Sequence, residues 1–220
     1  VPNTGAAWPL SDKFGCSVDM AVSLLMKAAE LGLDPYGVSF HVGSQQTNSD
    51  QWDIALARVA MVFTDLRDKG IDLKSINLGG GFPTQYRDEI PEVEEFGQSI
   101  LETLTRHFGN QIPEIMLEPG RYIAADAGLL RSEVVLVSRK SSDAKERWVY
   151  LDVGKFGGLM ETTDEAIQYS LRTTKDGSET GPAIIAGPTC DGADVLYPTV
   201  RYDLPLSLKS GDHLDFKSAG

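Results

Sequence analysis

The sequence has few cysteines, no long apolar run and a deficit of positive charge. Its two cysteines, Cys16 and Cys190, lie far apart and form no Cys-x-x-Cys pair, which argues against a disulfide framework and a thiolate zinc site. No apolar stretch approaches the roughly 20 residues that a membrane-spanning helix needs. Because 20 Lys and Arg face 32 Asp and Glu, the net charge of −12 repels phosphate backbones. We therefore expect no membrane or nucleic-acid partner, and a reducing, cytoplasmic compartment.

The composition is that of a folded globular protein. With 41% hydrophobic and 24% charged residues among 220, the chain differs from disordered, collagenous and coiled-coil sequences. At this length a chain buries roughly 70% of its unfolded surface, so a core needs no cross-links.

Residues 1–128 alternate short apolar segments with amphipathic helical stripes. Ser17 and Asn48 or Ser49 are candidate helix caps, and Gly32 and Gly70 are helix ends. The predicted strands are 36–43, 74–78 and 115–118, and the predicted stripes are Met20, Leu24, Ala28 and Leu31; Trp52, Leu56, Val59, Phe63 and Leu66; and Phe96, Ile100, Leu104 and Phe108. Strands that alternate with helices pair in parallel, so this region is α/β.

This α/β region is too small to close on itself. About three helices and four strands make roughly half of an eight-stranded barrel of about 250 residues. Half a barrel leaves open sheet edges, which invite pairing with other chains. We therefore interpret residues 1–128 as the second half of a TIM-like (β/α)8 barrel and the chain as a fragment.

Residues 129–220 have the period of strands and few long helical stripes. Segments 132–138, 147–152, 183–186 and 204–208 are strand-like, and 172–182 reads as a surface loop. The sequence predicts a second, mostly antiparallel β domain that is incomplete.

Three short motifs rich in glycine and polar residues follow the predicted parallel strands: HVGS at 41–44, GGGFP at 79–83 and EPGR at 118–121. His41 and Gly79 are 38 positions apart, and Gly79 and Glu118 are 39 apart, which is about one strand-helix unit. We therefore expect all three motifs at one rim, at the carboxyl ends of the strands, where barrel active sites lie.

These motifs favour a phosphate ligand. Consecutive glycines let backbone amides approach an anion, while Ser44 adds a hydroxyl donor and Arg121 a cationic fork. Each motif alone has a simpler explanation. The glycines suit a plain turn, His41 suits a satisfied core or rim position, and Glu118 suits an ion pair with Arg121.

A fourth motif, GPTCDGAD at 187–194, lies in the β region. Cys190 beside Asp191 could supply a proton donor next to a cation anchor. The alternative is a buried, inert cysteine followed by an Asp-Gly turn.

With these motifs assembled, the chain resembles the pyridoxal-phosphate-dependent decarboxylases of basic amino acids with the alanine-racemase fold, and within them the bacterial ornithine/lysine decarboxylases. The resemblance runs from residue 8 to residue 220. The segments that carry it are WPLSDKFG at 8–15, GVSFHVGS at 37–44, NLGGGFP at 77–83, EPGR at 118–121, DVGKFGG at 152–158 and GPTCD at 187–191.

The resemblance implies a role for each barrel motif. His41 would stack on the cofactor ring, and Glu118 would face its pyridine nitrogen. A carboxylate there keeps the nitrogen protonated, so the ring can accept the electron pair left by carbon dioxide; a racemase of this fold is expected to have arginine instead. The phosphate would be held by Ser44, by the amides of Gly79, Gly80 and Gly81, and by Gly120 and Arg121.

The resemblance also implies roles in the β domain. Cys190 would protonate the substrate carbon, and Asp191 would bind the distal ammonium group. In the family both reach the neighbouring subunit's site, so a homodimer is expected. The diaminopimelate branch is expected to carry Cys-Glu-Ser where this chain has Cys190, Asp191 and Gly192, which favours ornithine or lysine as substrate, putrescine or cadaverine as product, and a place in polyamine biosynthesis.

Three departures from the family pattern stand out. The lysine that binds the cofactor covalently is expected upstream of Val1, and Lys155 is not a substitute. The C-terminal Ala-Tyr-Thr segment is absent. Tyr169-Ser170 replaces a Tyr-Asp pair of some relatives, which leaves Asp164 and Glu165 as possible substrate carboxylates. The alternatives are a decarboxylase for diaminopimelate, arginine or carboxynorspermidine, and a non-catalytic homologue that binds a regulatory partner.

Overall fold

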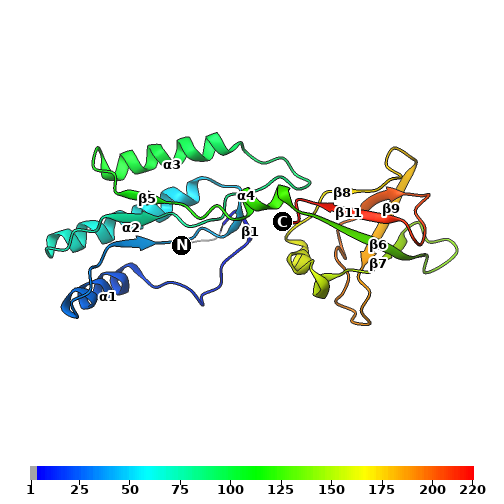
Figure 1. Ribbon diagram of the computed structural model, residues 1–220, viewed down its shortest axis with the longest axis horizontal. Coiled ribbons are helices and arrows are strands. Elements are labelled where there is room, and N and C mark those ends of the chain that lie inside the picture. Colours follow the sequence, from blue (N-terminus) through cyan, green and yellow to red (C-terminus); the bar gives the residue numbers. More distant parts are fainter. Residues whose placement is uncertain (1–3) are drawn as a thin grey trace. The chain divides into compact units, whose positions relative to one another are not determined.

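The computed structural model describes residues 4–220, which form two compact units (Figure 1). The first unit runs to Thr84 and continues over Ile90–Ile123. The second unit consists of Ala124–Gly220 together with the short segment Gln85–Glu89, which leaves the first unit and returns to it.

The first unit is built on a parallel sheet of order β2-β4-β5, with Val38, Ile76 and Ile115 in register. This confirms the predicted parallel pairing. The elements are β1 (Ala6–Trp8), α1 (Val18–Glu30), β2 (Gly37–Ser39), β3 (Ser44–Gln46), α2 (Asp50–Asp68), β4 (Ser75–Asn77), α3 (Val93–Phe108), β5 (Glu114–Met116) and α4 (Arg121–Ala124). The strands are shorter than predicted, because the backbone leaves the sheet to form loops at the carboxyl ends; β3 instead pairs with β1.

Helices α2 and α3 cover the sheet with the predicted stripes. The side chains of the α2 stripe are all buried. All but Leu66 share one core with Phe96, Ile100 and Leu104 of α3, and Leu66 packs against α1. The ring of Trp52 lies 4.9 Å from that of Phe82, so the helix core extends under the glycine motif. At the start of α3, Glu92 and Glu95 form a capping box.

The predicted stripe of α1 is wrong as a description of its buried face. Met20, Leu24 and Leu31 are exposed, whereas Val22 is buried against α2 with Val62 and Leu66. Most of the circumference of α1 is apolar, so spacing alone did not identify the side that packs.

The second unit is one six-stranded sheet of order β10-β9-β7-β6-β11-β8. Its pairings are antiparallel except for β7 with β9, so the sheet is mixed. The strands are β6 (Leu129–Ser138), β7 (Arg147–Leu151), β8 (Leu171–Arg172), β9 (Thr180–Ala186), β10 (Tyr202–Pro205) and β11 (His213–Lys217). Strands β8 and β11 were not predicted, and the predicted strand at 204–208 ends at Pro205.

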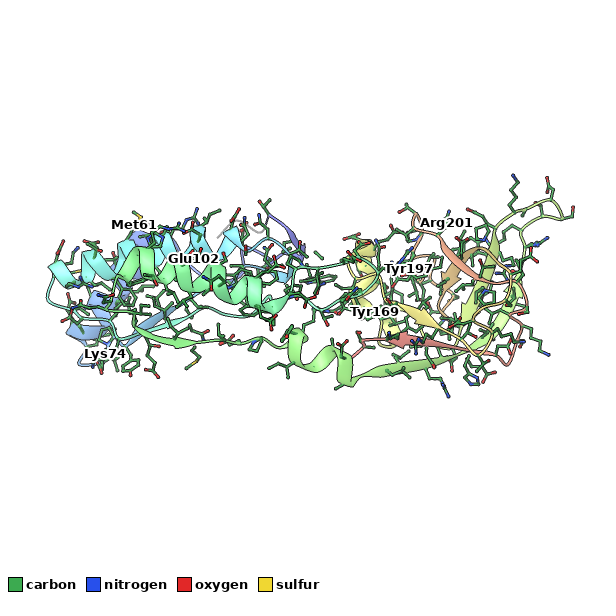
Figure 2. The ribbon with its side chains drawn as sticks, turned by 90° about the horizontal axis from the view of Figure 1, so that it is seen from above. Met61, Lys74, Glu102, Tyr169, Tyr197 and Arg201 are labelled. Atoms are coloured by element: carbon green, nitrogen blue, oxygen red, sulfur yellow. The ribbon has the colours of Figure 1, made fainter. Side chains whose placement is uncertain are left out.

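Three tyrosines, Tyr169, Tyr197 and Tyr202, lie in the otherwise mostly aliphatic core of the second unit, and Tyr169 and Tyr197 lie close together in Figure 2. The Tyr197 hydroxyl donates to the Ile167 carbonyl at 3.0 Å and accepts from the Tyr169 amide at 3.1 Å. The segment Gln85–Glu89 packs here as well, with the Arg87 guanidinium 4.4 Å from the centre of the Tyr202 ring. Within residues 4–220, no helix has the length and apolar character needed to cross a bilayer.

Candidate functional site

The loops that follow β2, β4 and β5 meet at the carboxyl edge of the parallel sheet. The Glu118 amide donates to the Gly79 carbonyl at 2.9 Å, which joins the third loop to the second. The Gln46 amide donates to the Gly81 carbonyl at 2.8 Å, which joins the first loop to the second. Three motifs separated by nearly forty residues each are therefore in direct contact, as their regular spacing predicts.

The glycine turn is the centre of this contact. A Cβ on Gly80 would overlap the Glu118 carbonyl oxygen and come within 3.2 Å of His41 Nε2. Gly79 and Gly81 have positive φ values of 67° and 99°, and each lies against a carbonyl oxygen of the 40–43 loop. Glycine is thus required by the packing itself, so the turn explanation and a ligand-binding role are compatible.

Substituting Gly80 tests how closely the loops must approach. We expect Gly80→Ala to lower the free energy of unfolding by about 1–3 kcal/mol, because the new methyl group forces the 79–83 and 118–121 loops apart. Chemical denaturation measures this change. The matched control is Gly97→Ala in α3, where a Cβ has nothing within 4 Å and helix propensity predicts slight stabilisation. Equal stability of the two variants would contradict the expectation.

His41 is held as a neutral imidazole. The Gly43 amide donates to its Nδ1 at 2.9 Å, so the ring proton resides on Nε2, the atom beside Gly80. Burial lowers the pKa of His41, and the nearby Glu118 carboxylate opposes this only in part. A neutral ring is suited to lying flat against an uncharged or cationic aromatic ligand.

The lowered His41 pKa predicts a pH dependence of stability. In the unfolded chain the pKa of this side chain returns to about 6.5. Below that pH the unfolded chain therefore binds a proton at His41 that the folded chain does not yet bind. The free energy of unfolding should therefore fall as the pH drops through 6.5 towards the folded pKa, and then level off for this group. We expect His41→Gln to flatten that slope in denaturation curves between pH 7.5 and 5, and the exposed His213→Gln serves as control. Identical slopes for both variants would refute the assignment.

Asn77 links the glycine turn to Glu118, and it was missed as a site residue. Its Nδ2 donates to Glu118 Oε1 at 2.6 Å, while its Oδ1 accepts from the Gly79 amide at 2.9 Å. One side chain thus orients both the carboxylate and the turn. Its position at the end of β4, two residues before the first glycine, was the available signal.

The other predicted anion-binding groups lie along the same rim. Arg121 Nη2 donates to Ser44 Oγ at 3.3 Å, which joins the first and third loops. Gly120, with a φ of 39°, forms the turn that leads into α4. Gln45 holds the far end of the glycine motif, since its side chain donates to the Thr84 carbonyl and accepts from the Thr84 amide.

Cys190 and Asp191 belong to the second unit. Both are exposed on the loop that follows β9, and the Asp191 carboxylate accepts from the Ala193 amide at 2.8 Å. Exposure of Cys190 contradicts the alternative of a buried, inert cysteine within the chain.

The two candidate substrate carboxylates of the second unit differ in their surroundings. Glu165 accepts from the Thr199 amide, the Thr199 hydroxyl and the Val200 amide, and these hydrogen bonds lower its pKa although burial raises it. The Glu165 carboxylate therefore binds the backbone of residues 199–200 within the chain. Asp164 precedes it with a φ of 54°.

The rim of the first unit combines two kinds of group that a single ligand could use. Backbone amides, a hydroxyl and a guanidinium suit a phosphate, while a carboxylate fixed by Asn77 suits a protonated ring nitrogen. The glycine turn is joined to the Glu118 loop by the hydrogen bond from the Glu118 amide to the Gly79 carbonyl.

Comparison with known proteins gives a family match and close relatives. Residues 3–125 match the family described as "Pyridoxal-dependent decarboxylase, pyridoxal binding domain". The chain is 30% identical to the lysine/ornithine decarboxylase of Selenomonas ruminantium over 96% of its own length and 52% of the relative's. It is also 30% identical to the diaminopimelate decarboxylase of Vibrio cholerae, over 95% of the chain and 48% of the relative.

A solved structure is similar in fold. The lysine/ornithine decarboxylase of Vibrio vulnificus, complexed with cadaverine, superposes with a TM-score of 0.83 at 32% identity, covering 96% of this chain and 56% of that one. The chain spans about half the length of the curated relatives it matches.

Proposed function

The chain belongs to the pyridoxal-dependent decarboxylase family, and from this we propose that the whole protein removes carbon dioxide from ornithine or lysine and releases the corresponding diamine. The observation that carries the proposal is the contact between the glycine turn and the Glu118 loop, with Asn77 bonded to both. Groups at that edge of the sheet can bind the phosphate and the ring nitrogen of one ligand at the same time.

The residues of the rim fit pyridoxal 5'-phosphate. We assign Ser44, the amides of Gly80 and Gly81, Gly120 and Arg121 to its phosphate, His41 to the face of its ring and Glu118 to its nitrogen. The Gly79 amide, also expected at the phosphate, instead donates to Asn77 Oδ1, so Gly79 shapes the turn. The glycine turn supports the phosphate assignment, because a backbone without side chains can approach an anion directly. When bound, the cofactor would supply an electron sink: its ring would accept the electron pair of the bond that breaks when carbon dioxide leaves the substrate.

The chain's own groups then control protons and orientation. Glu118, oriented by the Asn77 amide, would hold a proton on the ring nitrogen. Neutral His41 covers the ring without adding charge. Cys190 Sγ delivers the proton to the substrate carbon, and the Asp191 carboxylate pairs with the distal ammonium group.

The quaternary and domain arrangement is part of the same proposal. Residues 1–128 serve as the second half of the cofactor-binding barrel and residues 129–220 as an incomplete β domain. The protein acts as a homodimer in which Cys190 and Asp191 serve the partner's site. Their exposure within the chain is consistent with a role outside it.

Diaminopimelate is the second candidate substrate. The relative from Vibrio cholerae is as similar in identity as the lysine/ornithine enzyme. The sequence Cys190-Asp191-Gly192 favours ornithine or lysine, since an aspartate without a further serine suits a simple ammonium group.

The test uses the full-length protein. We expect it to show the visible absorption band of a bound pyridoxal cofactor and to release carbon dioxide from ornithine or lysine, with putrescine or cadaverine detected in equal amount. Diaminopimelate and arginine are measured in parallel. Release from one of these alone would reassign the substrate, while a protein with neither band nor release would be the non-catalytic homologue.

A further inference from the structure

We propose that Asp194 is a positioning residue whose buried carboxylate fixes the 187–194 loop and thereby sets the placement of Cys190 and Asp191. The proposal rests on the roles given to those two residues in the proposed function. Asp194 itself lies below the loop surface, only 2% exposed.

The Asp194 carboxylate binds two separate segments. Its Oδ1 accepts from the Lys155 amide at 2.9 Å. Its Oδ2 accepts from the Thr189 amide at 3.1 Å and from the Thr189 hydroxyl at 2.8 Å. Both oxygens are therefore used, which is the condition under which a carboxylate can be buried without a large penalty.

The backbone of Asp194 closes the loop. The Gly187 amide donates to the Asp194 carbonyl at 2.8 Å, and the Asp194 amide donates to the Asp191 carbonyl at 3.0 Å. Together with the Thr189 bonds, these contacts reach the residues on both sides of Cys190. The exposed tip of the loop thus depends on one buried residue.

Two glycines are shaped around this carboxylate. A Cβ on Gly154 or on Gly187 would overlap the Asp194 side-chain oxygens. Gly154 lies in the DVGKFGG motif and Gly187 opens the GPTCD motif, so the two motifs meet through Asp194. This contact gives a physical reason for the DVGKFGG motif, to which the catalytic proposal assigns no role.

Asparagine at position 194 is the decisive substitution. It keeps the size of the side chain but presents an NH2 group to at least one of the amide donors, which replaces an attraction by a repulsion. We expect the Asp194→Asn variant of the full protein to exchange the amide hydrogens of residues 187–194 at least tenfold faster than the wild type, by mass spectrometry. The matched control, Asp215→Asn, loses an ion pair with Arg131 in the same unit and should leave that exchange unchanged.

The functional measurements compare the effects of the substitution on kcat, on KM for the amino acid and on cofactor affinity. We expect Asp194→Asn to lower kcat about 10- to 100-fold and raise KM for the amino acid, since a displacement of about 1 Å can cost 10²-fold, while the Kd for pyridoxal phosphate changes less than twofold. Wild-type exchange in the loop, or unchanged kcat and KM, would overturn the proposal. Amide exchange of the loop is measured independently of turnover. An inactive wild-type protein would therefore contradict the proposed function, while the exchange experiment would still test the role of Asp194.

A second variant covers the case in which Asp194→Asn does not fold. Thr189→Val removes only the hydroxyl donor and should speed exchange of the same loop about threefold. If both variants fold, adding Thr189→Val to Asp194→Asn should have less effect than it has alone, because the two share one interaction. Full additivity, or a Thr189→Val loop that exchanges like the wild type, would count against the coupling.

Discussion

Replacing Glu118 by glutamine should lower kcat about 10²- to 10³-fold while the cofactor remains bound. The amide has the shape of the carboxylate but no charge, so the proton on the ring nitrogen loses its counter-ion and the electron sink is weakened. Loss of one preorganised electrostatic group in an active site typically has an effect of this size. Steady-state decarboxylation and the absorbance of bound cofactor, measured on the same preparation, separate turnover from binding.

The matched control for Glu118 lies in the strand that precedes it. Glu114 is an exposed carboxylate of β5 whose Oε2 accepts from the Tyr36 hydroxyl at 3.0 Å, away from the three loops. We expect Glu114→Gln to keep kcat within twofold. If Glu118→Gln behaved in the same way, the carboxylate would have no part in the chemistry and the phosphate-binding loops would need another explanation.

Replacing Cys190 by alanine should lower diamine formation about 10²- to 10⁴-fold, the usual contribution of a positioned proton donor. Alanine cannot supply a proton, so the substrate carbon must obtain one from water or be protonated elsewhere. We therefore expect the ratio of diamine to released carbon dioxide to fall below one, with cofactor absorbance retained. Parallel assays of carbon dioxide and of diamine give this ratio directly.

Cys16 provides the control for Cys190, because it is the chain's other free cysteine and is also exposed. Cys16→Ala should leave both products in their wild-type ratio. A Cys190→Ala variant that forms diamine and carbon dioxide in equal amounts at the wild-type rate would remove Cys190 from the mechanism. Because this prediction concerns product ratio, it is independent of the Glu118 prediction.

Local patterns were reliable where one face of an element was clearly apolar. The whole predicted stripe of α2 is buried, and so are Phe96, Ile100 and Leu104 of α3, whereas Phe108 is only partly buried. In α1 the same reasoning failed, since Met20 and Leu24 are apolar but exposed and Val22 is the buried residue. Periodicity identifies a buried face most clearly when the opposite face is polar.

Very short strands and contacts between distant segments could not be predicted from the sequence. Strand β8 has two residues, and its identity as a strand comes from pairing with β11 more than forty residues away. Asn77 and Asp194 stand in motifs that the sequence singles out, but their roles come from the donors and acceptors that the fold brings to them.

The sequence by itself determined the alternation of parallel strands and helices and the meeting of three motifs at one edge of the sheet. It could do so because strand-helix units of equal length return the chain to the same side of the sheet. Only the tertiary structure decided which side chains hold those motifs in place: Asn77 between the glycine turn and Glu118, and Asp194 beneath Cys190. Those roles depend on hydrogen bonds between residues about forty positions apart, at 2.6 Å for Asn77 and Glu118 and 2.9 Å for Asp194 and Lys155. Such contacts are specified by packing in three dimensions rather than by spacing along the chain.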